Sequence, residues 1–333
     1  MTPQPPLVDR FDRIHTSLRI SVTDRCNIRC FYCMPLENVQ FKPRAELLTF
    51  EEIERVARIA VSLGVQKFRL TGGEPLVRAQ LHELVQRLAA IPGVEDLALT
   101  TNGVLLADQA AALHDAGLRR LNVSLDGLSE EMFRRITRRQ GVDRVLQGIA
   151  AAQAVGFVGI RLNAVSIRGL TESEIVPLAR FSREHNLELR FIEFMPLDAD
   201  KNWGAAQVLS GAEVREIISR DVAELSPVRR ADLSQPAVDY EYADSPVRVG
   251  FINSVTEPFC GDCNRLRITA EGQLRNCLFS TEEWDVRSLL RGGATNEVVA
   301  KLFQDCTSAK RRGHGSDDQG FADTQRAMYQ IGG

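Results

Sequence analysis

The sequence predicts an α/β protein in which six β–α units build a parallel sheet and a smaller, β-rich segment follows. The first observation is that short apolar runs alternate with helical stretches between residues 17 and 194. The second is that these runs are almost continuously apolar, as expected for parallel strands buried on both faces. The third is the length of 333 residues, which exceeds the usual limit for one core. These patterns leave undecided whether the sheet is open or curled into a barrel.

The individual elements follow from local signals. Thr49 and Glu52 form a capping box that opens a helix ending near Ser62. A strand ends at Thr71-Gly-Gly, and Gly141 is expected to break a long helix. We expect strands at 17–22, 67–70, 95–101, 119–125, 158–167 and 187–194, and helices at 50–62, 78–90, 105–116, 129–154 and 171–185.

The regular alternation of strands and helices ends near residue 200. Residues 222–278 are β-like and rich in turns, residues 285–309 are expected to be helical, and the chain from Lys310 onward is polar and contains several glycines. We therefore divide the sequence into an N-terminal leader (1–16), the β–α repeat (17–200), a C-terminal segment (201–309) and a mobile tail that ends in Gly332-Gly333 (310–333).

Polar or otherwise unusual residues collect at the carboxyl ends of the expected strands. In parallel α/β proteins the functional site lies at this edge of the sheet. The residues at or near these ends are Cys26, Gly72, Thr100, Ser124, Asn163 and Met195.

The charge of the chain argues against several classes of protein. There are 41 basic and 44 acidic residues, so the net charge of −3 does not recruit nucleic acid or a membrane surface, and any anion site must be built locally. The N-terminus has no secretory signal pattern and no apolar run is long enough to span a bilayer, so we expect a cytoplasmic protein. In that compartment the seven cysteines are thiols, metal ligands or nucleophiles rather than disulfides.

Three cysteines form the first cluster of candidate ligands. Cys26, Cys30 and Cys33 have the spacing C-x3-C-x2-C, so their thiolates can converge from one short loop. A four-iron cube needs four ligands, and three cysteines leave one iron open for a small molecule, as in catalytic rather than structural metal sites. The alternatives are a zinc site with an unseen fourth ligand, or three thiols in the core.

A second group of cysteines lies in the C-terminal segment. Cys260, Cys263 and Cys277 have the spacing C-x2-C-x13-C. A zinc ion would need a fourth ligand, which His314 or Cys306 could supply, and a second iron–sulfur cluster is the other interpretation. Cys306 lies in a predicted helix among apolar residues, so we interpret it as a core residue.

Two arginines follow the second group directly. Arg265 and Arg267 are two positions apart, which on a strand directs both side chains to one face. Beside a metal site such a pair would clamp an anion, whereas the ordinary alternative is a solvated strand face.

The first cysteine motif resembles the signature of the radical S-adenosylmethionine (SAM) enzymes. It has an aromatic residue before the last cysteine, and Thr71-Gly-Gly-Glu-Pro75 resembles the family's second motif, which receives the SAM amino group. Seven segments together resemble the GTP 3′,8-cyclase family, which catalyses the first step of molybdenum cofactor biosynthesis. They are Leu18-Arg-Ile-Ser-Val-Thr-Asp-Arg-Cys26, Cys30-Phe-Tyr-Cys33-Met-Pro35, Phe68-Arg-Leu-Thr-Gly-Gly-Glu-Pro75, Leu99-Thr-Thr-Asn-Gly103, Leu121-Asn-Val-Ser-Leu-Asp126, Leu189-Arg-Phe-Ile-Glu193 and Phe259-Cys-Gly-Asp-Cys-Asn-Arg-Leu-Arg267.

The resemblance implies an incomplete (β/α)6 radical SAM barrel whose open side is closed by a C-terminal β-rich domain, with one [4Fe–4S] cluster at each cysteine group. It implies SAM contacts at Tyr32, Gly73, Ser124 and Met195. It implies GTP contacts at Arg19, Arg69, Thr100, Arg161, Arg265, Leu266 and Arg267. Arg161 stands where the family usually has Lys, so a planar fork replaces a point charge.

The activity that the resemblance implies starts with a 5′-deoxyadenosyl radical, which takes hydrogen from ribose C3′ of GTP. The C3′ radical attacks C8 of guanine, and the resulting radical is reduced to give (8S)-3′,8-cyclo-7,8-dihydroguanosine 5′-triphosphate. The terminal Gly332-Gly333 is expected to reach into the active site. Implied partners are a flavodoxin-like or similar reductant protein and the downstream cyclic pyranopterin monophosphate synthase, with a homodimer left open and no nucleic acid or membrane partner.

Two other functions compete with this one. One is another radical SAM enzyme with an accessory cluster, such as a peptide maturase, although those C-terminal regions usually carry more cysteines. The other is an iron–sulfur or zinc regulator that binds nucleic acid, which the absence of a basic patch disfavours.

Overall fold

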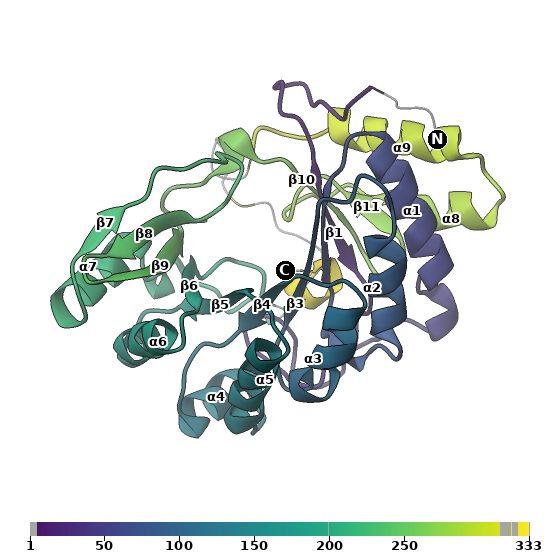
Figure 1. Cartoon of the computed structure of the whole chain (residues 1–333). Coiled ribbons are helices and arrows are strands. Elements are labelled where there is room, and N and C mark those ends of the chain that lie inside the picture. The colour runs from purple at the N-terminus through teal and green to yellow at the C-terminus, as the bar shows by residue number, and fades with distance from the viewer. Residues whose placement is uncertain (1–4, 199, 314–320, 322–325, 333) are drawn as a thin grey trace.

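Six parallel strands form the centre of the fold, as the sequence predicts. The computed structural model describes residues 5–198, 200–313, 321 and 326–332. The six strands are β1 (Ser17–Ser21), β2 (Lys67–Thr71), β3 (Asp96–Thr101), β4 (Arg120–Ser124), β5 (Gly159–Ser166) and β6 (Glu188–Glu193). Each pairs with the next in parallel, while β1 and β6 do not pair with one another. The sheet is strongly curved (Figure 1) and stays open.

The helices that connect these strands cover the outer, convex side of the sheet (Figure 1). They are α1 (Phe50–Ser62), α2 (Leu81–Ala89), α3 (Leu106–Asp115), α4 (Glu130–Thr137), α5 (Val142–Ala154) and α6 (Glu172–Glu184). The predicted capping box is confirmed, because the Thr49 hydroxyl accepts from the Glu52 N–H and the Glu52 carboxylate accepts from the Thr49 N–H. The predicted break is also confirmed, since Gly141 separates α4 from α5 with a φ of 129°.

The C-terminal segment extends the sheet at both of its edges. Its elements are α7 (Gly211–Asp221), β7 (Leu225–Pro227), β8 (Val238–Tyr242), β9 (Ser245–Ile252), β10 (Arg265–Ile268), β11 (Gln273–Arg275), β12 (Trp284–Asp285), α8 (Val286–Arg291), α9 (Asn296–Ser308) and α10 (Met328–Ile331). β9 pairs with β6 and β10 pairs with β1, both in parallel. In the described residues this makes one sheet of twelve strands in the order β12-β11-β10-β1-β2-β3-β4-β5-β6-β9-β8-β7. The segment therefore satisfies the unpaired edges of the open sheet, which the prediction of a separate covering domain did not anticipate.

Two details differ from the sequence prediction. The single helical stretch expected at 285–309 is wrong, because α8 and α9 are separated by a turn in which Gly293 has a φ of 75°. Short 3-10 turns, which were not predicted, lie at Arg44–Glu46, Pro75–Val77, Ala205–Gln207 and Cys260–Asp262.

The expectation that the strands are apolar on both faces is also wrong for β1 and β2. In β1, Leu18 and Ile20 are fully buried in the hydrophobic core, and Arg19 between them faces the concave side. In β2, Phe68 and Leu70 lie in the same core, and Arg69 faces the concave side. The apolar side chains thus pack beneath the helices, while the concave side carries charged groups because it lines a cavity.

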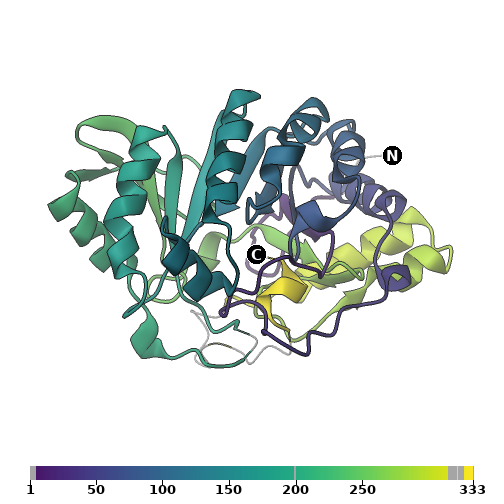
Figure 2. The same ribbon diagram turned by 90° about the horizontal axis from the view of Figure 1, so that it is seen from below.

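The end of the chain lies inside the curve of the sheet. Figures 1 and 2 show α10 in yellow on the concave side, near the strands at its centre. Tyr329 and Ile331 of α10 are buried. Residues 326–332 therefore pack as part of the fold, while Gly333 and most of the remaining tail lie outside the described residues.

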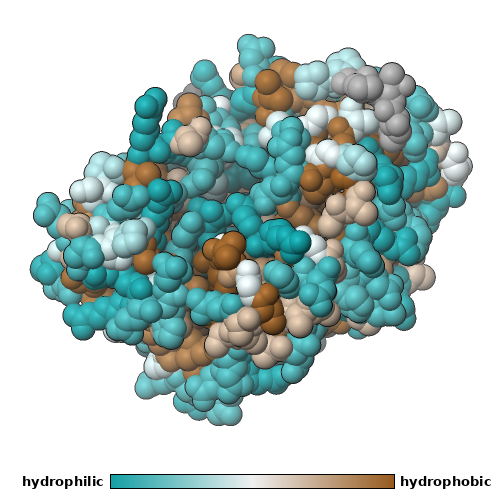
Figure 3. Space-filling view, in the orientation of Figure 1, coloured by the Kyte–Doolittle hydropathy of each residue, from teal (hydrophilic) through white to brown (hydrophobic). Residues whose placement is uncertain are grey.

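The outer surface seen in Figure 3 is mostly hydrophilic, with hydrophobic residues gathered only in small groups. Within the described part of the chain, no helix is both long and apolar enough to cross a lipid bilayer.

Replacement of Thr49 by Ala is expected to lower the free energy of unfolding by about 1 kcal/mol, because the N–H of Glu52 loses its acceptor at the start of α1. Urea unfolding followed by circular dichroism measures this change. Thr49→Ser keeps the hydroxyl and should stay close to wild type. Equal stability of the Ala variant and wild type would contradict the capping role.

Candidate active site

The concave side of the sheet encloses a cavity with about 1300 Å³ of empty space, its open mouth included. Its walls come from the parallel strands, from the C-terminal segment and from Met328 of α10. Of the predicted site residues, the lining brings together Arg19, Tyr32, Arg69, Thr100, Met195, Cys260, Cys263, Arg265, Arg267 and Cys277. Residues that are far apart in the sequence thus surround one space.

Strand pairing places three arginines side by side in this cavity. The register of β1 sets Arg19 opposite Arg267 of β10 on one side and opposite Arg69 of β2 on the other. Arg265 lines the same cavity, and Leu266 between the two β10 arginines has its side chain in the hydrophobic core. The prediction that Arg265 and Arg267 share one strand face is therefore confirmed.

Positive charge outweighs negative charge around these arginines. Burial, followed by the charges of Arg267 and Arg69, lowers the pKa of Arg19 well below its usual value. Burial, followed by the charge of Arg120, lowers the pKa of Arg69 to about 9. Buried like charges destabilise one another unless an anion offsets them, so this row is suited to a strongly anionic ligand.

The carboxylate in the cavity wall already has hydrogen-bond partners. Among the described lining residues, Glu193 is the one carboxylate. It accepts hydrogen bonds from the backbone N–H groups of Val255 and Thr256, both at 2.8 Å, and from the Thr256 hydroxyl at 2.5 Å. Glu193 thus ties the end of β6 to the turn after β9 and is not a partner of the arginine row.

Arg190 is a site residue that the sequence analysis did not assign. It lies in β6, is 5% exposed and lines the cavity. Burial, followed by the charge of Arg161, lowers its pKa to about 10. Its Nη2 lies 3.7 Å from an Oε2 of Glu188 and 4.0 Å from Oδ1 of Asp239. The signal available in the sequence was an arginine within an apolar strand, which is unusual in a parallel sheet.

Arg161 lies outside the main cavity and lines a smaller neighbouring cavity. This second cavity shares Arg19, Arg69 and Arg190 with the first, so the two are adjacent. The guanidinium of Arg161 donates to the carboxylate of Glu188. The basic lining therefore continues from the arginine row to β5, with Glu188 as its counter-ion.

The second cysteine group lies beside the arginine row. Cys260 is buried, and Cys263 and Cys277 are half-buried. Arg265 Nη2 lies 3.4 Å from the Cys263 sulfur, and Lys310 Nζ lies 3.5 Å from it. Burial by itself would raise the pKa of Cys263, but Arg265 and Lys310 bring it well below its usual value. A thiolate held in this way suits a metal ligand.

The tail closes on the arginine row. The carbonyl oxygen of Gly332 accepts a hydrogen bond from Arg267 Nη1 at 2.6 Å, and that of Ile331 accepts one from the Ser21 hydroxyl at 3.2 Å. Gly332 has a φ of 81°, and a Cβ there would lie 2.4 Å from Ser21 Oγ and 2.6 Å from Thr71 Cγ2. Only glycine fits this position without displacing its neighbours.

The loop that carries the first cysteine group is anchored on α4. The N–H of Arg29 donates to the Thr137 carbonyl at 2.8 Å, and the N–H of Phe31 donates to the Ile136 carbonyl at 3.1 Å. Cys33 closes a turn by donating its N–H to the Cys30 carbonyl at 2.9 Å. These contacts fix the loop at the carboxyl edge of β1, as the motif predicts.

Burial and nearby carboxylates disfavour ionisation of the three thiols of this loop, and the charge of Arg29 only partly opposes this at Cys26. Burial, followed by the charge of Glu74, raises the pKa of Cys26 to about 11. Burial, followed by the charge of Asp126, raises the pKa of Cys30 well above its usual value, and burial also raises that of Cys33. A bound cationic metal would stabilise the thiolates of such a group. The donor set therefore fits an iron–sulfur cluster.

The four residues predicted to contact SAM lie at the carboxyl edge of the sheet. Tyr32 and Met195 line the cavity, and the Tyr32 hydroxyl donates to Asp126 Oδ2 at 2.6 Å. Gly73 donates its N–H to the Thr23 carbonyl at 2.8 Å, which joins the Thr71–Pro75 turn to the chain leading to Cys26. Ser124 is the last residue of β4 and, like Gly73, is not part of the cavity lining.

The zinc interpretation depended on a fourth ligand. Cys306 has no exposed surface and belongs to the hydrophobic core, which confirms its interpretation as a core residue. His314 lies outside the described residues. Within the described part of the chain, no three His, Cys, Asp or Glu side chains are grouped closely enough for a single metal ion.

Comparisons with known proteins match this chain to two family models and to relatives over almost their whole length. The pattern of the radical SAM superfamily matches residues 20–182, and the pattern described as Molybdenum Cofactor Synthesis C matches residues 187–316. A GTP 3′,8-cyclase from Rhodopirellula baltica is 53% identical over 336 residues, which cover 100% of this chain and 94% of that protein. One from Pelotomaculum thermopropionicum is 46% identical and covers 98% of this chain and 99% of that protein.

Solved structures share the fold at low sequence identity. Streptococcus suis SuiB bound to S-adenosylmethionine superposes with a TM-score of 0.63 at 14% identity, covering 94% of this chain and 78% of SuiB. The protein anSMEcpe with bound AdoMet gives a TM-score of 0.59 at 16% identity, covering 94% of this chain and 89% of that chain. The arrangement of strands and helices is therefore shared among distant proteins.

The buried pair of Tyr32 and Asp126 predicts a pH effect on stability. Burial raises the pKa of Asp126 to about 6, although the hydrogen bonds from Tyr32 and Val165 lower it. Between 3.8, the ordinary pKa of an aspartic acid, and about 6, the unfolded carboxyl is ionised while the folded one keeps its proton. This stabilising contribution is fully present below that range and is lost as the pH rises through it.

Urea unfolding of the metal-free protein from pH 3.8 to about 6 should therefore show the free energy of unfolding of wild type falling relative to Asp126→Asn as the pH rises. Asp115→Asn is the matched control, because the Asp115 side chain is 84% exposed and its loss should leave the pH dependence of wild type unchanged. Parallel pH profiles for wild type and Asp126→Asn would contradict a protonated buried carboxyl.

Proposed function

Because this chain belongs to the GTP 3′,8-cyclase family of radical SAM enzymes, we propose that it converts GTP to (8S)-3′,8-cyclo-7,8-dihydroguanosine 5′-triphosphate, the first step of molybdenum cofactor biosynthesis. The observation that carries this proposal is the row of Arg267, Arg19 and Arg69 beside the second cysteine group. A nucleoside triphosphate brings several negative charges to one end and an uncharged base to the other. The row offsets the charges, and the cysteine site next to it leaves room for the base.

As a radical SAM enzyme, the chain uses a [4Fe–4S] cluster and SAM. We assign this cluster to Cys26, Cys30 and Cys33, and a second [4Fe–4S] cluster to Cys260, Cys263 and Cys277. When bound, the first cluster and SAM supply the 5′-deoxyadenosyl radical that takes hydrogen from ribose C3′. The fit of the first donor set rests on buried thiols beside Glu74 and Asp126, whose thiolates a cationic metal would stabilise, and the fit of the second rests on the thiolate character of Cys263.

The residues proposed for SAM are Tyr32, Gly73, Ser124 and Met195. Tyr32 is held by Asp126, whose other oxygen accepts from the Val165 N–H at 2.7 Å, so the ring is fixed toward the cavity. Met195 follows β6 and lines the same cavity. Fixed positions in the cavity wall suit a reaction in which a reactive carbon must be held close to its target.

The residues proposed for GTP are Arg19, Arg69, Thr100, Arg161, Arg265, Leu266 and Arg267, to which we add Arg190. Arg161 and Arg190 approach Glu188, so phosphate oxygens would compete with that carboxylate for two guanidinium groups. Leu266 would contribute through its backbone, since its side chain is in the core. The forked geometry of Arg161 supports bidentate contact with a phosphate.

The described tail residues would shield the reaction from water. Met328 lines the cavity, and Gly332 contacts Arg267. A closed wall on this side keeps a reactive radical from solvent and confines it to the bound substrate. This supports a role of the terminal glycines in the chemistry rather than in stability alone.

The remaining proposals concern the surroundings of the enzyme. We propose a flavodoxin-like or similar reductant protein as electron donor and cyclic pyranopterin monophosphate synthase as the enzyme that consumes the product. Free thiols and oxygen-sensitive clusters suit a reducing compartment, which supports a cytoplasmic location. A homodimer is compatible with these roles.

Anaerobic incubation with SAM, GTP and a reductant tests the function. We expect 5′-deoxyadenosine together with a product of the same mass as GTP but with a new C3′–C8 bond, and about eight irons per chain. Arg69→Ala should raise KM for GTP by about ten- to hundredfold through loss of a charged hydrogen-bond donor, while Arg58→Ala on the exposed face of α1 serves as the control. Formation of 5′-deoxyadenosine without cyclised GTP, or stoichiometric zinc, would overturn the proposal.

Removal of Gly332 and Gly333 should leave iron content and SAM cleavage close to wild type but reduce cyclised product by about 100-fold, because the substrate pocket loses its closing contact on Arg267. Gly332→Ala should act in the same direction, since its Cβ would meet Ser21 and Thr71. Gly169→Ala is the matched control, with a similar φ of 76° and no atom within 4 Å of the added carbon. Wild-type turnover of the shortened protein would refute this role.

A further inference from the structure

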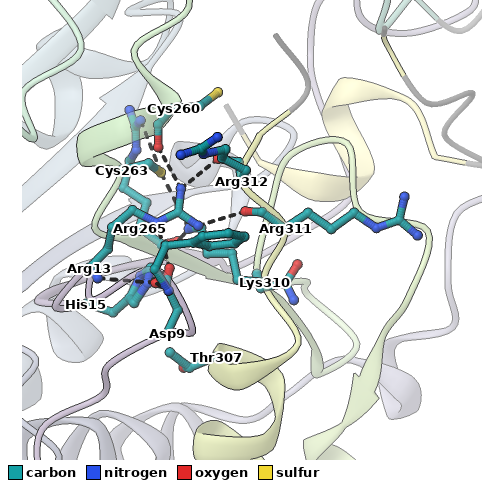
Figure 4. Close-up of polar contacts among 12 residues, drawn as sticks. Asp9, Arg13, His15, Cys260, Cys263, Arg265, Thr307, Lys310, Arg311 and Arg312 are labelled. Carbon is teal, nitrogen blue, oxygen red and sulfur yellow. Dashed lines mark hydrogen bonds and ion pairs between the residues drawn. The ribbon is translucent and has the colours of Figure 1, made fainter. Parts of the chain in front are cut away.

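A buried polar network joins the leader, the second cysteine loop and the start of the tail (Figure 4). Arg13 is at its centre, with a side chain that is 7% exposed. Its Nη1 donates to the carbonyl of Cys260 at 2.6 Å and to that of Arg312 at 2.7 Å, and its Nη2 donates to the carbonyl of Arg311 at 2.7 Å. One guanidinium thus holds the cysteine loop and the segment after α9 together.

The charge of Arg13 is matched within the leader itself. Its Nε donates to Asp9 Oδ2 at 2.7 Å, and His15 Nε2 lies 3.0 Å from the same oxygen. Burial, followed by the charge of Lys310, lowers the pKa of His15 to about 4, so this imidazole is neutral near pH 7. Asp9 is therefore the counter-ion of Arg13.

Lys310 is buried beside this network without a carboxylate of its own. It is 2% exposed. Its Nζ donates to the carbonyl of Arg265 at 2.8 Å and lies 3.5 Å from the sulfur of Cys263. Within the described residues it forms no ion pair with Asp or Glu. A buried ammonium needs an opposite charge, and the group that it touches is the Cys263 sulfur.

The position of Lys310 is imposed by the fold. Its N–H donates to the Thr307 carbonyl at 3.0 Å at the end of α9, and Arg13 holds the two residues that follow it. A little further on, Gly313 packs on Cys260 so closely that a Cβ would lie 2.2 Å from Cys260 Cβ. The chain is therefore held in place both before and after Lys310, and this keeps its ammonium against Cys263.

We propose that Lys310 is a positioning residue of the second cysteine site, whose ammonium is, beside the Arg265 guanidinium, a counter-charge of the Cys263 thiolate and helps to set the reduction potential of a cluster bound there. Hydrogen bonds and positive charge at a ligating sulfur stabilise the reduced, more negative form of a cluster. Loss of the ammonium therefore makes the midpoint potential more negative or weakens the hold on the cluster. This inference rests on the proposed second [4Fe–4S] cluster.

The test uses the full chain with Cys26, Cys30 and Cys33 replaced by Ser, so that only the second site can hold a cluster. Iron and sulfide content and the midpoint potential, measured by a redox titration followed by electron paramagnetic resonance, are compared in this background. The variants are Lys310→Met, Lys310→Gln and Lys310→Arg. The matched control is Lys301→Met on α9, whose side chain is 69% exposed and paired with Asp305.

We expect Lys310→Met to show a more negative midpoint potential than Lys301→Met, or a loss of cluster iron in a folded protein. Lys310→Arg should restore most of the effect, because it keeps the charge. If Lys310→Met does not fold, Lys310→Gln keeps a donor for the Arg265 carbonyl without the charge and should behave as predicted for Met. If the uncharged variants have the same iron content and midpoint potential as Lys301→Met, the role of Lys310 is overturned and the second cluster stands. If the protein with the three Cys→Ser replacements binds no iron, the second cluster is overturned as well.

Discussion

The pairing of β1 with β10 on one side and β2 on the other places the guanidinium groups of Arg267, Arg19 and Arg69 next to one another. Three like charges in register on adjacent strands repel each other, and Arg267 is buried while Arg19 and Arg69 are half-buried. The sheet tolerates them because the apolar residues between them pack beneath the helices and supply the stability. An anionic ligand is then the natural complement of the row.

β1 links the two cysteine sites. Its residues pair with β10, whose preceding loop carries Cys260 and Cys263 of the second group, and its end leads into the loop of the first group. The C-terminal segment is therefore attached to the sheet by strand hydrogen bonds rather than laid over it. Under the proposed function, a substrate against β10 and a cofactor beyond the end of β1 would be held by one continuous sheet, which would fix their relative position without a separate domain interface.

Several features were predictable because they depend on local chemistry. The spacing of Cys26, Cys30 and Cys33 indicated a cluster with an open iron, and the capping box at Thr49 and the break at Gly141 were confirmed. The prediction that Arg265 and Arg267 share a face was also confirmed, since side-chain alternation along a strand needs no tertiary information. The contacts of individual residues with SAM and GTP remain predictions.

By itself, the sequence determined the β–α order, the ligand types and the reaction class, because motif spacing and local propensity act over a few residues. Only the tertiary structure decided that the C-terminal strands extend both edges of the sheet, that Arg190 joins the cavity and that Gly332 reaches Arg267. It also decided that Lys310 lies against Cys263, a residue 47 positions away. Such long-range contacts depend on strand pairing and burial across the whole chain, which no local pattern encodes.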